Sequence, residues 1–247
     1  MRGAVLVTGG ARRIGRAICR ALAEDGWRVL VHARLAGDGD AQSLASELGG
    51  RAFFADLSEP LGPARLFNAV CAEEPAVSAL VNNAAVFSTE AELPPDDAAR
   101  MAAVNAAAPE KLTTMLAMRL MTNDERGPGL PSSGAVVNIL DSRILPILHS
   151  AGGASAASGR TPYVRSKTAL WEAQRRAAAN FASVLRVNGV APGPVLAPSA
   201  AHEKGGETLL GSRPTPEDVA QAVVFLLSAK ATTGSVIPVD SGQSLLF

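Results

Sequence analysis

The chain has few of the residue types that build disulfide-rich or metal-binding proteins. Among its 247 residues are two cysteines, Cys19 and Cys71, which form no CxxC pair and have no histidine pair near them. Each lies in an apolar helical pattern, which indicates a small buried residue in a reducing compartment. We therefore expect neither a disulfide nor a metal site. Tyrosine is also scarce, since Tyr163 is the only one.

The sequence also lacks an excess of charge of either sign and a long hydrophobic run. Its 23 Lys and Arg balance its 23 Asp and Glu, so no overall field attracts nucleic acid or an anionic membrane. No apolar segment is long enough to span a bilayer, and the first one leads into a glycine-rich loop rather than a cleavage-type sequence. We expect a cytoplasmic protein that acts on a small molecule, with no nucleic-acid or membrane partner.

Hydrophobic residues make up 47% of the chain, which is enough for a large core. Short apolar runs predict strands, and the patterns between them predict helices. The expected strands are 3–8, 28–32, 51–55, 78–82, 134–140, 183–190 and 235–239, and the expected helices are 13–24, 41–48, 63–72, 97–121, 162–182 and 216–229. This alternation predicts a single α/β domain over 1–247, a doubly wound parallel sheet of about seven strands with helices on both faces.

The stretch TGGARRIG (8–15) lies between the first strand and the first helix. In a doubly wound sheet this turn binds a nucleotide, because glycines admit the phosphates to the backbone and the helix start offers unpaired N–H groups. Gly9 and Gly15, with Ile14 between loop and helix, suit that task. The arginines Arg12 and Arg13 add local positive charge to an otherwise neutral chain.

The end of the second strand reads VLVHAR and carries His32 and Arg34, with no acid before Asp38. Proteins that bind NAD have an acidic residue there, which accepts a hydrogen bond from the ribose 2′-hydroxyl, whereas an arginine suits the 2′-phosphate of NADP. Guanidinium pairs with phosphate in bidentate fashion. Asp38 and Asp40 fit a turn that caps the next helix. We therefore expect NADPH, with Arg12 and Arg34 at its 2′-phosphate.

Tyr163 and Lys167 lie four positions apart in the motif YVRSK, so a helix places them on one face. An ammonium beside a phenol favours the ionised phenol and lowers its pKa. We expect this pair to act as a proton donor beside a hydride acceptor.

The motifs TGGARRIG, NNAA (82–85), Asn105 in VNAAAP, YVRSK (163–167), APG (191–193) and VDSG (239–242) occur in the order found in short-chain dehydrogenases/reductases. The resemblance spans nearly the whole chain. It implies that Lys167 also bonds the nicotinamide ribose and that Asn105 belongs to a proton relay. It further implies that Asn83 and Ala84 line the path of the cofactor. By the same resemblance, Asp56 and Leu57 lie at the adenine, and Pro192 and Gly193 lie near the nicotinamide.

Three departures from the family pattern resemble its pteridine reductase and dihydromonapterin reductase subgroup. Arg13 replaces the middle glycine of the loop, Asp141 stands where most members have a catalytic serine, and Phe87 follows NNAAV. Phe87 can stack on a flat pterin, unless it is a core aromatic. Asp141 can accept hydrogen bonds from the pterin amino group, and Arg13 can bridge the cofactor pyrophosphate and the substrate.

The spacing between Asp141 and Tyr163, 22 positions, exceeds the usual separation of the family's serine and tyrosine. Strand register favours Asp141, while spacing alone favours Ser150; Ser142 is a further candidate. We interpret the small-residue stretch 150–162 as a flexible insertion at the mouth of the site, and 194–213 as a substrate lid.

Three functions follow from these patterns. The first is an NADPH-dependent pteridine reductase that transfers hydride to a C=N bond, with Arg13, Phe87, Asp141 and Tyr163 at the substrate. The second is an NADPH-dependent reductase of a small ketone or aldehyde, in which Ser142 or Ser150 polarises the carbonyl. The third is a sensor that binds NADPH without turnover. The resemblance also implies a homotetramer or dimer, formed through the two long helices.

Overall fold

The computed structural model describes residues 2–87, 97–126, 130–148, 161–195 and 208–246. Its centre is a parallel sheet of seven strands in the order β3-β2-β1-β4-β5-β6-β7. The strands are β1 (Ala4–Val7), β2 (Arg28–Ala33), β3 (Arg51–Phe54), β4 (Val77–Asn82), β5 (Gly134–Ile139), β6 (Leu185–Pro192) and β7 (Val236–Val239). The predicted fold class is confirmed, and strand bounds shift by a few residues.

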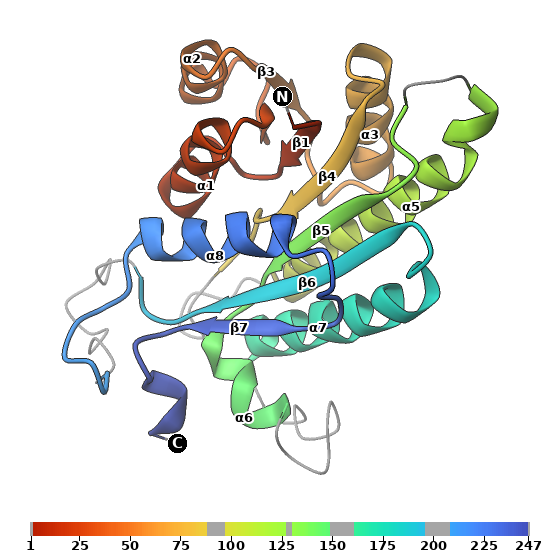
Figure 1. Cartoon of the computed structure of the whole chain (residues 1–247). Coiled ribbons are helices and arrows are strands. Elements are labelled where there is room, and N and C mark those ends of the chain that lie inside the picture. Colours follow the sequence, from red (N-terminus) through yellow and green to blue (C-terminus); the bar gives the residue numbers. More distant parts are fainter. Residues whose placement is uncertain (1, 88–96, 127–129, 149–160, 196–207, 247) are drawn as a thin grey trace.

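Helices cover both faces of this sheet (Figure 1). One face carries α1 (Arg13–Glu24), α2 (Gly39–Glu47) and α8 (Pro216–Ser228), and the other carries α3 (Gly62–Glu73), α5 (Ala108–Arg126) and α7 (Pro162–Asn180). Each layer has its own core: Ile18 and Leu22 of α1 pack with Val223 of α8, while Leu112 and Leu116 of α5 pack with Leu66 of α3. Strands that are apolar on both faces therefore lie between two helical layers.

The starts of α7 and α8 follow from local sequence. Thr161 accepts a hydrogen bond from the Val164 N–H at 3.3 Å, and Pro162 occupies the first turn of α7. Thr215 and Asp218 form a reciprocal capping box at α8, also with a proline in the first turn. Such side-chain acceptors satisfy N–H groups that have no partner within the helix. The cap at Thr161 fixes the beginning of the helix that carries Tyr163 and Lys167.

The expected continuous helix over 97–121 is wrong in its middle. The chain forms α4 (Asp97–Ala102), a π-helical turn η2 (Ala103–Ala107) and then α5. The π turn contains Asn105, whose side chain is fully buried. Widened turns of this type occur often at functional sites, and this one carries a residue predicted for catalysis.

Three short elements were not predicted. Residues after β5 form the 3-10 turn η3 (Ser142–Ile144) and helix α6 (Leu145–Leu148), and the C-terminal segment forms the 3-10 turn η5 (Gln243–Leu245). Most of the proposed insertion 150–162 and of the lid 194–213 lies outside the described residues. Cys19 is buried as expected, whereas Cys71 is only partly buried. Among the described helices, none combines the length and apolar character needed to cross a membrane.

Candidate active site

A cavity of about 520 Å³ opens at the carboxyl ends of the strands, where the strand order reverses between β1 and β4. Ligands of doubly wound sheets bind at this switch point, and the volume suits a small-molecule site. The described residues that line it include every predicted site residue except Asn105, namely Gly9, Arg12, Arg13, Ile14, Gly15, His32, Arg34, Asp56, Leu57, Asn83, Ala84, Phe87, Asp141, Tyr163, Lys167, Pro192 and Gly193.

The glycine loop is shaped so that no larger side chain fits. Gly9 has φ +61°, and a Cβ on it would lie 3.0 Å from the Ala84 Cα. A Cβ on Gly15 would lie 2.2 Å from the Gly9 carbonyl oxygen and 2.6 Å from the Asn83 Nδ2. Asn83 ties the loop to β4, because its amide donates to the Thr8 and Gly9 carbonyls at 2.9 Å each. The loop is thus closely packed and preformed.

Arg13 adopts the backbone of the glycine it replaces. Its φ is +53°, in the left-handed region, which costs a residue with a Cβ about 1–2 kcal/mol. Helix α1 follows directly, and its first turn has neither a side-chain cap nor an acidic residue. The helix start therefore leaves its N–H groups and positive dipole end toward the cavity, as a pyrophosphate requires.

His32 at the end of β2 joins two walls of the cavity. Its Nδ1 accepts from the Gly9 N–H at 3.2 Å, and its Nε2 lies 3.0 Å from the Ala55 carbonyl oxygen. These contacts require a neutral ring with the proton on Nε2. Burial lowers the pKa of His32 to about 4, so the ring is neutral at physiological pH. His32 holds the glycine loop against the segment that leads to Asp56.

Asp56 lies at the edge of the cavity beyond β3. Its Oδ1 accepts from the Ser58 N–H at 2.8 Å and from the Ser58 hydroxyl at 2.6 Å. These hydrogen bonds, with help from the charges of Arg100 and Arg34, lower the pKa of Asp56. The carboxylate therefore stays ionised and can accept from an amino group, as a contact with adenine requires.

Arg12 is held by the two acids that the sequence places in the next turn. Its Nε lies 2.5 Å from the Asp40 Oδ2, and its Nη2 lies 3.3 Å from the Asp38 Oδ2. Asp38 also caps α2 by accepting from the Ala41 N–H at 3.2 Å, as expected. The hydrogen bond that Arg12 donates to Asp40 raises the pKa of Arg12. The arginine expected at a 2′-phosphate is thus already paired with carboxylates.

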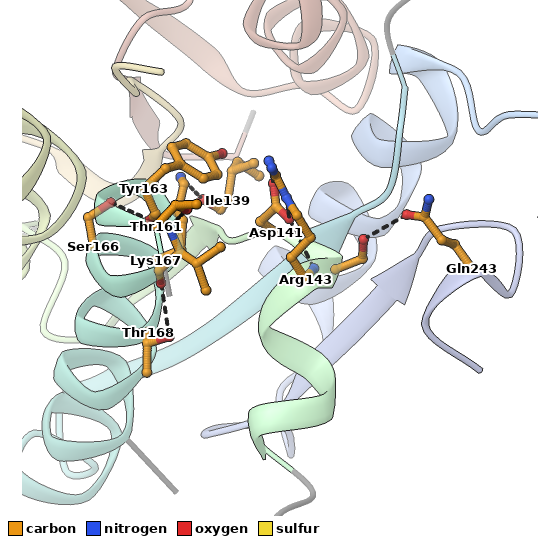
Figure 2. Close-up of polar contacts among 11 residues, drawn as sticks. Ile139, Asp141, Arg143, Thr161, Tyr163, Ser166, Lys167, Thr168 and Gln243 are labelled. Carbon is orange, nitrogen blue, oxygen red and sulfur yellow. Dashed lines mark hydrogen bonds and ion pairs between the residues drawn. The ribbon is translucent and has the colours of Figure 1, made fainter. Parts of the chain in front are cut away.

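Tyr163 and Lys167 share one face of α7, as Figure 2 shows, and the Lys167 Nζ lies 5.8 Å from the Tyr163 ring centroid. The ammonium donates to the Ile139 carbonyl at 2.7 Å. Burial lowers the pKa of Lys167 to about 8. The expected effect on Tyr163 is wrong for this arrangement: burial, followed by the Asp141 carboxylate, raises the pKa of Tyr163, and the nearby cation that opposes this rise is Arg143.

Asp141 follows β5 and lies in the cavity wall, with its side chain 15% exposed. Ser142, the alternative, is buried and donates to the Gln243 Oε1 at 3.2 Å, and Figure 2 shows Gln243 on the far side from Tyr163. Among the described residues, Asp141 lines the cavity and Ser142 does not, and the assignment of Asp141 to the family's serine position stays a prediction. Ser150 lies outside the described residues.

Phe87 is a cavity residue rather than a core aromatic. It is 49% exposed, and its ring stands edge-on to Tyr163 with centroids 4.9 Å apart. Its position is secured by Asn105, whose amide accepts from the Val86 N–H at 2.7 Å and donates to the Val86 carbonyl at 2.9 Å. Asn105 also donates to the Ser166 hydroxyl at 3.0 Å. This side chain positions Phe87 and α7, and its expected place in a proton relay stays a prediction.

Several cavity residues were not predicted. Arg100 and Val104 come from α4 and η2, and the others are Ala55, Ala85, Val86, Ile139 and Leu140. Arg143 is not among the residues that line the cavity, but it is the most consequential omission, because it pairs with Asp141 and lies over two aromatic rings. A basic residue two positions after a candidate catalytic acid was the available signal. No group of three or more potential metal-binding side chains occurs in the part of the chain that the structure describes.

A switch-point cavity with a glycine loop and a Tyr–Lys pair defines a nucleotide-binding oxidoreductase. A family profile described as enoyl-(acyl carrier protein) reductase matches residues 9–244. Pteridine reductase 1 of Leishmania tarentolae is 32% identical over 97% of this chain and 96% of its own. A Streptomyces violaceoruber protein named as a ketoacyl reductase of the granaticin polyketide synthase is 35% identical, covering 98% and 96%. The chain belongs to the short-chain dehydrogenase/reductase family.

Solved structures of this family agree in fold. FolM alternative dihydrofolate reductase 1 from Brucella canis, in complex with NADP, superposes with a TM-score of 0.81 at 29% identity and covers 100% of this chain and 96% of its own. The family expected from the motifs is therefore confirmed, as is the class of enzyme.

Proposed function

We propose that this enzyme is an NADPH-dependent pteridine reductase, which transfers hydride to a C=N bond of a dihydropterin or dihydrofolate. The observation that carries the proposal is the carboxylate of Asp141 in the cavity wall beside Tyr163, while Ser142 faces away. A carboxylate accepts N–H donors, which a pterin has along its amino edge and a simple ketone lacks. The exposed ring of Phe87 and the charge of Arg13 support the same substrate class.

NADP(H) is the cofactor, and the cavity fits it. A Cβ on Gly15 would clash with the backbone, and one on Gly9 would be tight and strained by the positive φ, so backbone N–H groups rather than side chains would meet the pyrophosphate. Arg12 and Arg34 line the end where a 2′-phosphate would lie, beside Asp56 and Leu57 at the adenine. NADPH, when bound, supplies the hydride from its nicotinamide ring.

The residues of the chain would then perform the proton transfer. The Tyr163 hydroxyl would donate a proton to the nitrogen of the C=N bond whose carbon accepts the hydride. Lys167, charged below a pH of about 8, lies 5.8 Å from the Tyr163 ring centroid and can bond the nicotinamide ribose. Phe87 would stack on the pterin ring, and Asp141 would accept from its amino group and orient it.

Reduction of a ketone is the second candidate, favoured by the identity to the ketoacyl reductase of S. violaceoruber. It uses the same Tyr163 and Lys167, with a hydroxyl in place of the carboxylate. The substrates that the enzyme reduces therefore distinguish a pteridine reductase from a ketone reductase. The test follows NADPH oxidation on dihydropterins, dihydrofolate, simple ketones and quinonoid carbonyls, each repeated with NADH.

Turnover of dihydropterins with NADPH supports the proposal, and turnover of ketones alone overturns it. Two variants sharpen the result. Phe87→Ala is expected to raise the KM for a pterin about tenfold through lost stacking, with little effect on a small aliphatic ketone. Asp141→Ser restores the family's hydroxyl and is expected to shift preference toward ketones.

The assembly and location proposed from the family resemblance are a homotetramer or dimer in the cytoplasm. Exposed apolar side chains on α5, Met118 at 61% and Met121 at 47%, are consistent with a covered helix face. Light scattering coupled to size-exclusion chromatography measures the assembly, and a monomeric mass overturns this proposal.

A further inference from the structure

Arg143 lies beside the catalytic residues and is bound to one of them. Two positions after Asp141, it is the middle residue of the short turn η3 that follows β5. Its Nε and Nη2 lie 2.8 and 2.9 Å from the two oxygens of Asp141, a two-pronged ion pair visible in Figure 2. The Arg143 N–H also donates to Asp141 at 3.0 Å. The guanidinium therefore pairs with both carboxylate oxygens of Asp141.

The same guanidinium lies over the two aromatic rings of the site. Its central carbon is 4.9 Å from the Tyr163 ring centroid and 5.5 Å from the Phe87 ring centroid. A flat cation at these distances is attracted to a ring face. Half of the Arg143 side chain remains exposed to solvent, so it can leave the rings without unpacking the core.

These contacts match those that the proposed substrate would make. A guanidinium is a flat group in which one carbon carries three nitrogens, and its edge donates two parallel N–H bonds to a carboxylate. The amino edge of a pterin also has one carbon bearing three nitrogens within a flat ring system. Asp141 and Phe87 thus already hold, in Arg143, a group with the shape and donors of that edge.

We propose that Arg143 is a specificity-determining residue that occupies the place of the substrate's amino edge and leaves it only to a flat molecule with equivalent N–H donors. This inference rests on the proposed pteridine reductase function. A pterin replaces both the pairing to Asp141 and the stacking on Phe87, so the exchange leaves no carboxylate unpaired. A simple ketone provides no N–H donor, so its entry would leave the largely buried Asp141 carboxylate with the Arg143 backbone N–H but without the two guanidinium donors.

The experiment removes the side chain and then supplies its head group separately. In Arg143→Ala, loss of the internal competitor is expected to lower the KM for a dihydropterin about fivefold and to raise kcat/KM for a small ketone. Methylguanidinium, at millimolar concentrations that leave the protein folded, is expected to inhibit Arg143→Ala competitively and the parent enzyme far less. Arg143→Met, which keeps the length of the stem without its charge, should match Arg143→Ala in KM.

A matched control comes from Arg20, whose side chain is as exposed as that of Arg143 and forms an ion pair with Glu47 at 3.0 Å, away from the cavity. Arg20→Met should have the same KM and the same sensitivity to methylguanidinium as the parent enzyme. A raised or unchanged pterin KM in Arg143→Ala, or absence of methylguanidinium competition, overturns the proposal.

Failure of the proposed function gives a different result. In that case neither the parent enzyme nor Arg143→Ala turns over any dihydropterin, whatever methylguanidinium does. Methylguanidinium competition against a ketone substrate would then still place Arg143 over the substrate position, while the amino-edge specificity would be overturned together with the pteridine reductase function.

Discussion

The end of the cavity proposed for the adenosine and the end proposed for the substrate each have an ion pair between an arginine and a carboxylate, but they use this pairing in opposite ways. At the adenosine end, Arg12 lines the cavity, and Asp38 and Asp40 support it from α2. At the substrate end, Asp141 lines the cavity, and Arg143 covers it from η3. The group that faces the ligand is a cation at one end and an anion at the other.

This difference shows that an ion pair can prepare a site for either sign of ligand. The supporting partner holds the facing group in place and must compete with the ligand for it. A 2′-phosphate would compete with Asp38 and Asp40 for Arg12, whereas an N–H edge would compete with Arg143 for Asp141. Variants that change one end and spare the other therefore test the comparison.

The largest effect is expected from Tyr163→Phe, which removes the proton donor but keeps the ring that contacts Phe87. We expect kcat to fall about 10²–10⁴-fold, while the Kd for NADPH, measured by nucleotide fluorescence, stays within a factor of about two. A large change in that Kd would contradict the separation of the two ends.

Acid pH should lower the free energy of unfolding, because protonation of His32 is incompatible with its buried hydrogen bonds at the adenosine end. Because burial lowers the pKa of His32 from 6.5 to about 4, between these values the unfolded chain binds a proton that the folded chain does not. The free energy of unfolding should thus fall by up to about 3 kcal/mol as pH drops from 6.5 to 4. Urea titrations of the parent and of His32→Gln measure the difference, since glutamine can keep both hydrogen bonds without titrating. Parallel pH profiles would contradict the assignment.

Arg34→Ala should reduce the preference for NADPH over NADH. Loss of one charged hydrogen-bonding partner of the 2′-phosphate is worth about 10- to 100-fold in the ratio of kcat/KM values. The kcat with saturating NADPH should change little, because the substrate end is untouched. An unchanged ratio of kcat/KM with NADPH to kcat/KM with NADH would mean that Arg12 alone binds the 2′-phosphate.

Asp141→Asn should move the alkaline limit of activity. Lys167 has a pKa of about 8, lowered by burial, and the charge of Asp141 opposes that lowering. Without the carboxylate, the pKa of Lys167 falls further, so the decline of kcat/KM should begin at a pH lower by up to about one unit. A decline at the parent's pH would assign the limit to another group.

The smallest effect is expected from Asp40→Asn, which releases Arg12 from one carboxylate while Asp38 still caps α2. The exposed pair contributes little to stability, so the expected change is NADPH binding tighter by a factor of about two to five, with NADH unaffected. Isothermal titration with each nucleotide measures it, and weaker NADPH binding would show that Asp40 orients Arg12 instead of competing for it.

Most of the adenosine end could be predicted from local sequence. Gly9 follows an apolar strand, and Gly15 lies in the first turn of an amphipathic helix. At the substrate end, Thr161 followed by Pro162 marks the start of α7 in the same local way. These features depend on neighbours in the chain. The parallel sheet follows because each strand is joined to the next by a helix.

Other features could not be predicted, because they depend on contacts distant in the chain or on small energy differences. Arg12 meets Asp38 and Asp40 across 26 and 28 positions, and whether they pair depends on how α2 packs. The π turn around Asn105 lies in an alanine-rich stretch with a regular helical pattern. The raised pKa of Tyr163 results from burial and from Asp141, 22 positions earlier, which spacing within α7 does not reveal.

Tyr163 carries the chain's only phenol, and this gives the protein a built-in spectroscopic reporter. Fluorotyrosine supplied during expression would label the catalytic ring and no other position. The fluorine resonance is sensitive to the guanidinium that lies 4.9 Å from the ring centroid and to the edge-on ring of Phe87. One NMR signal would thus follow the occupancy of the substrate end in real time, with any flat ligand, before a single turnover has occurred.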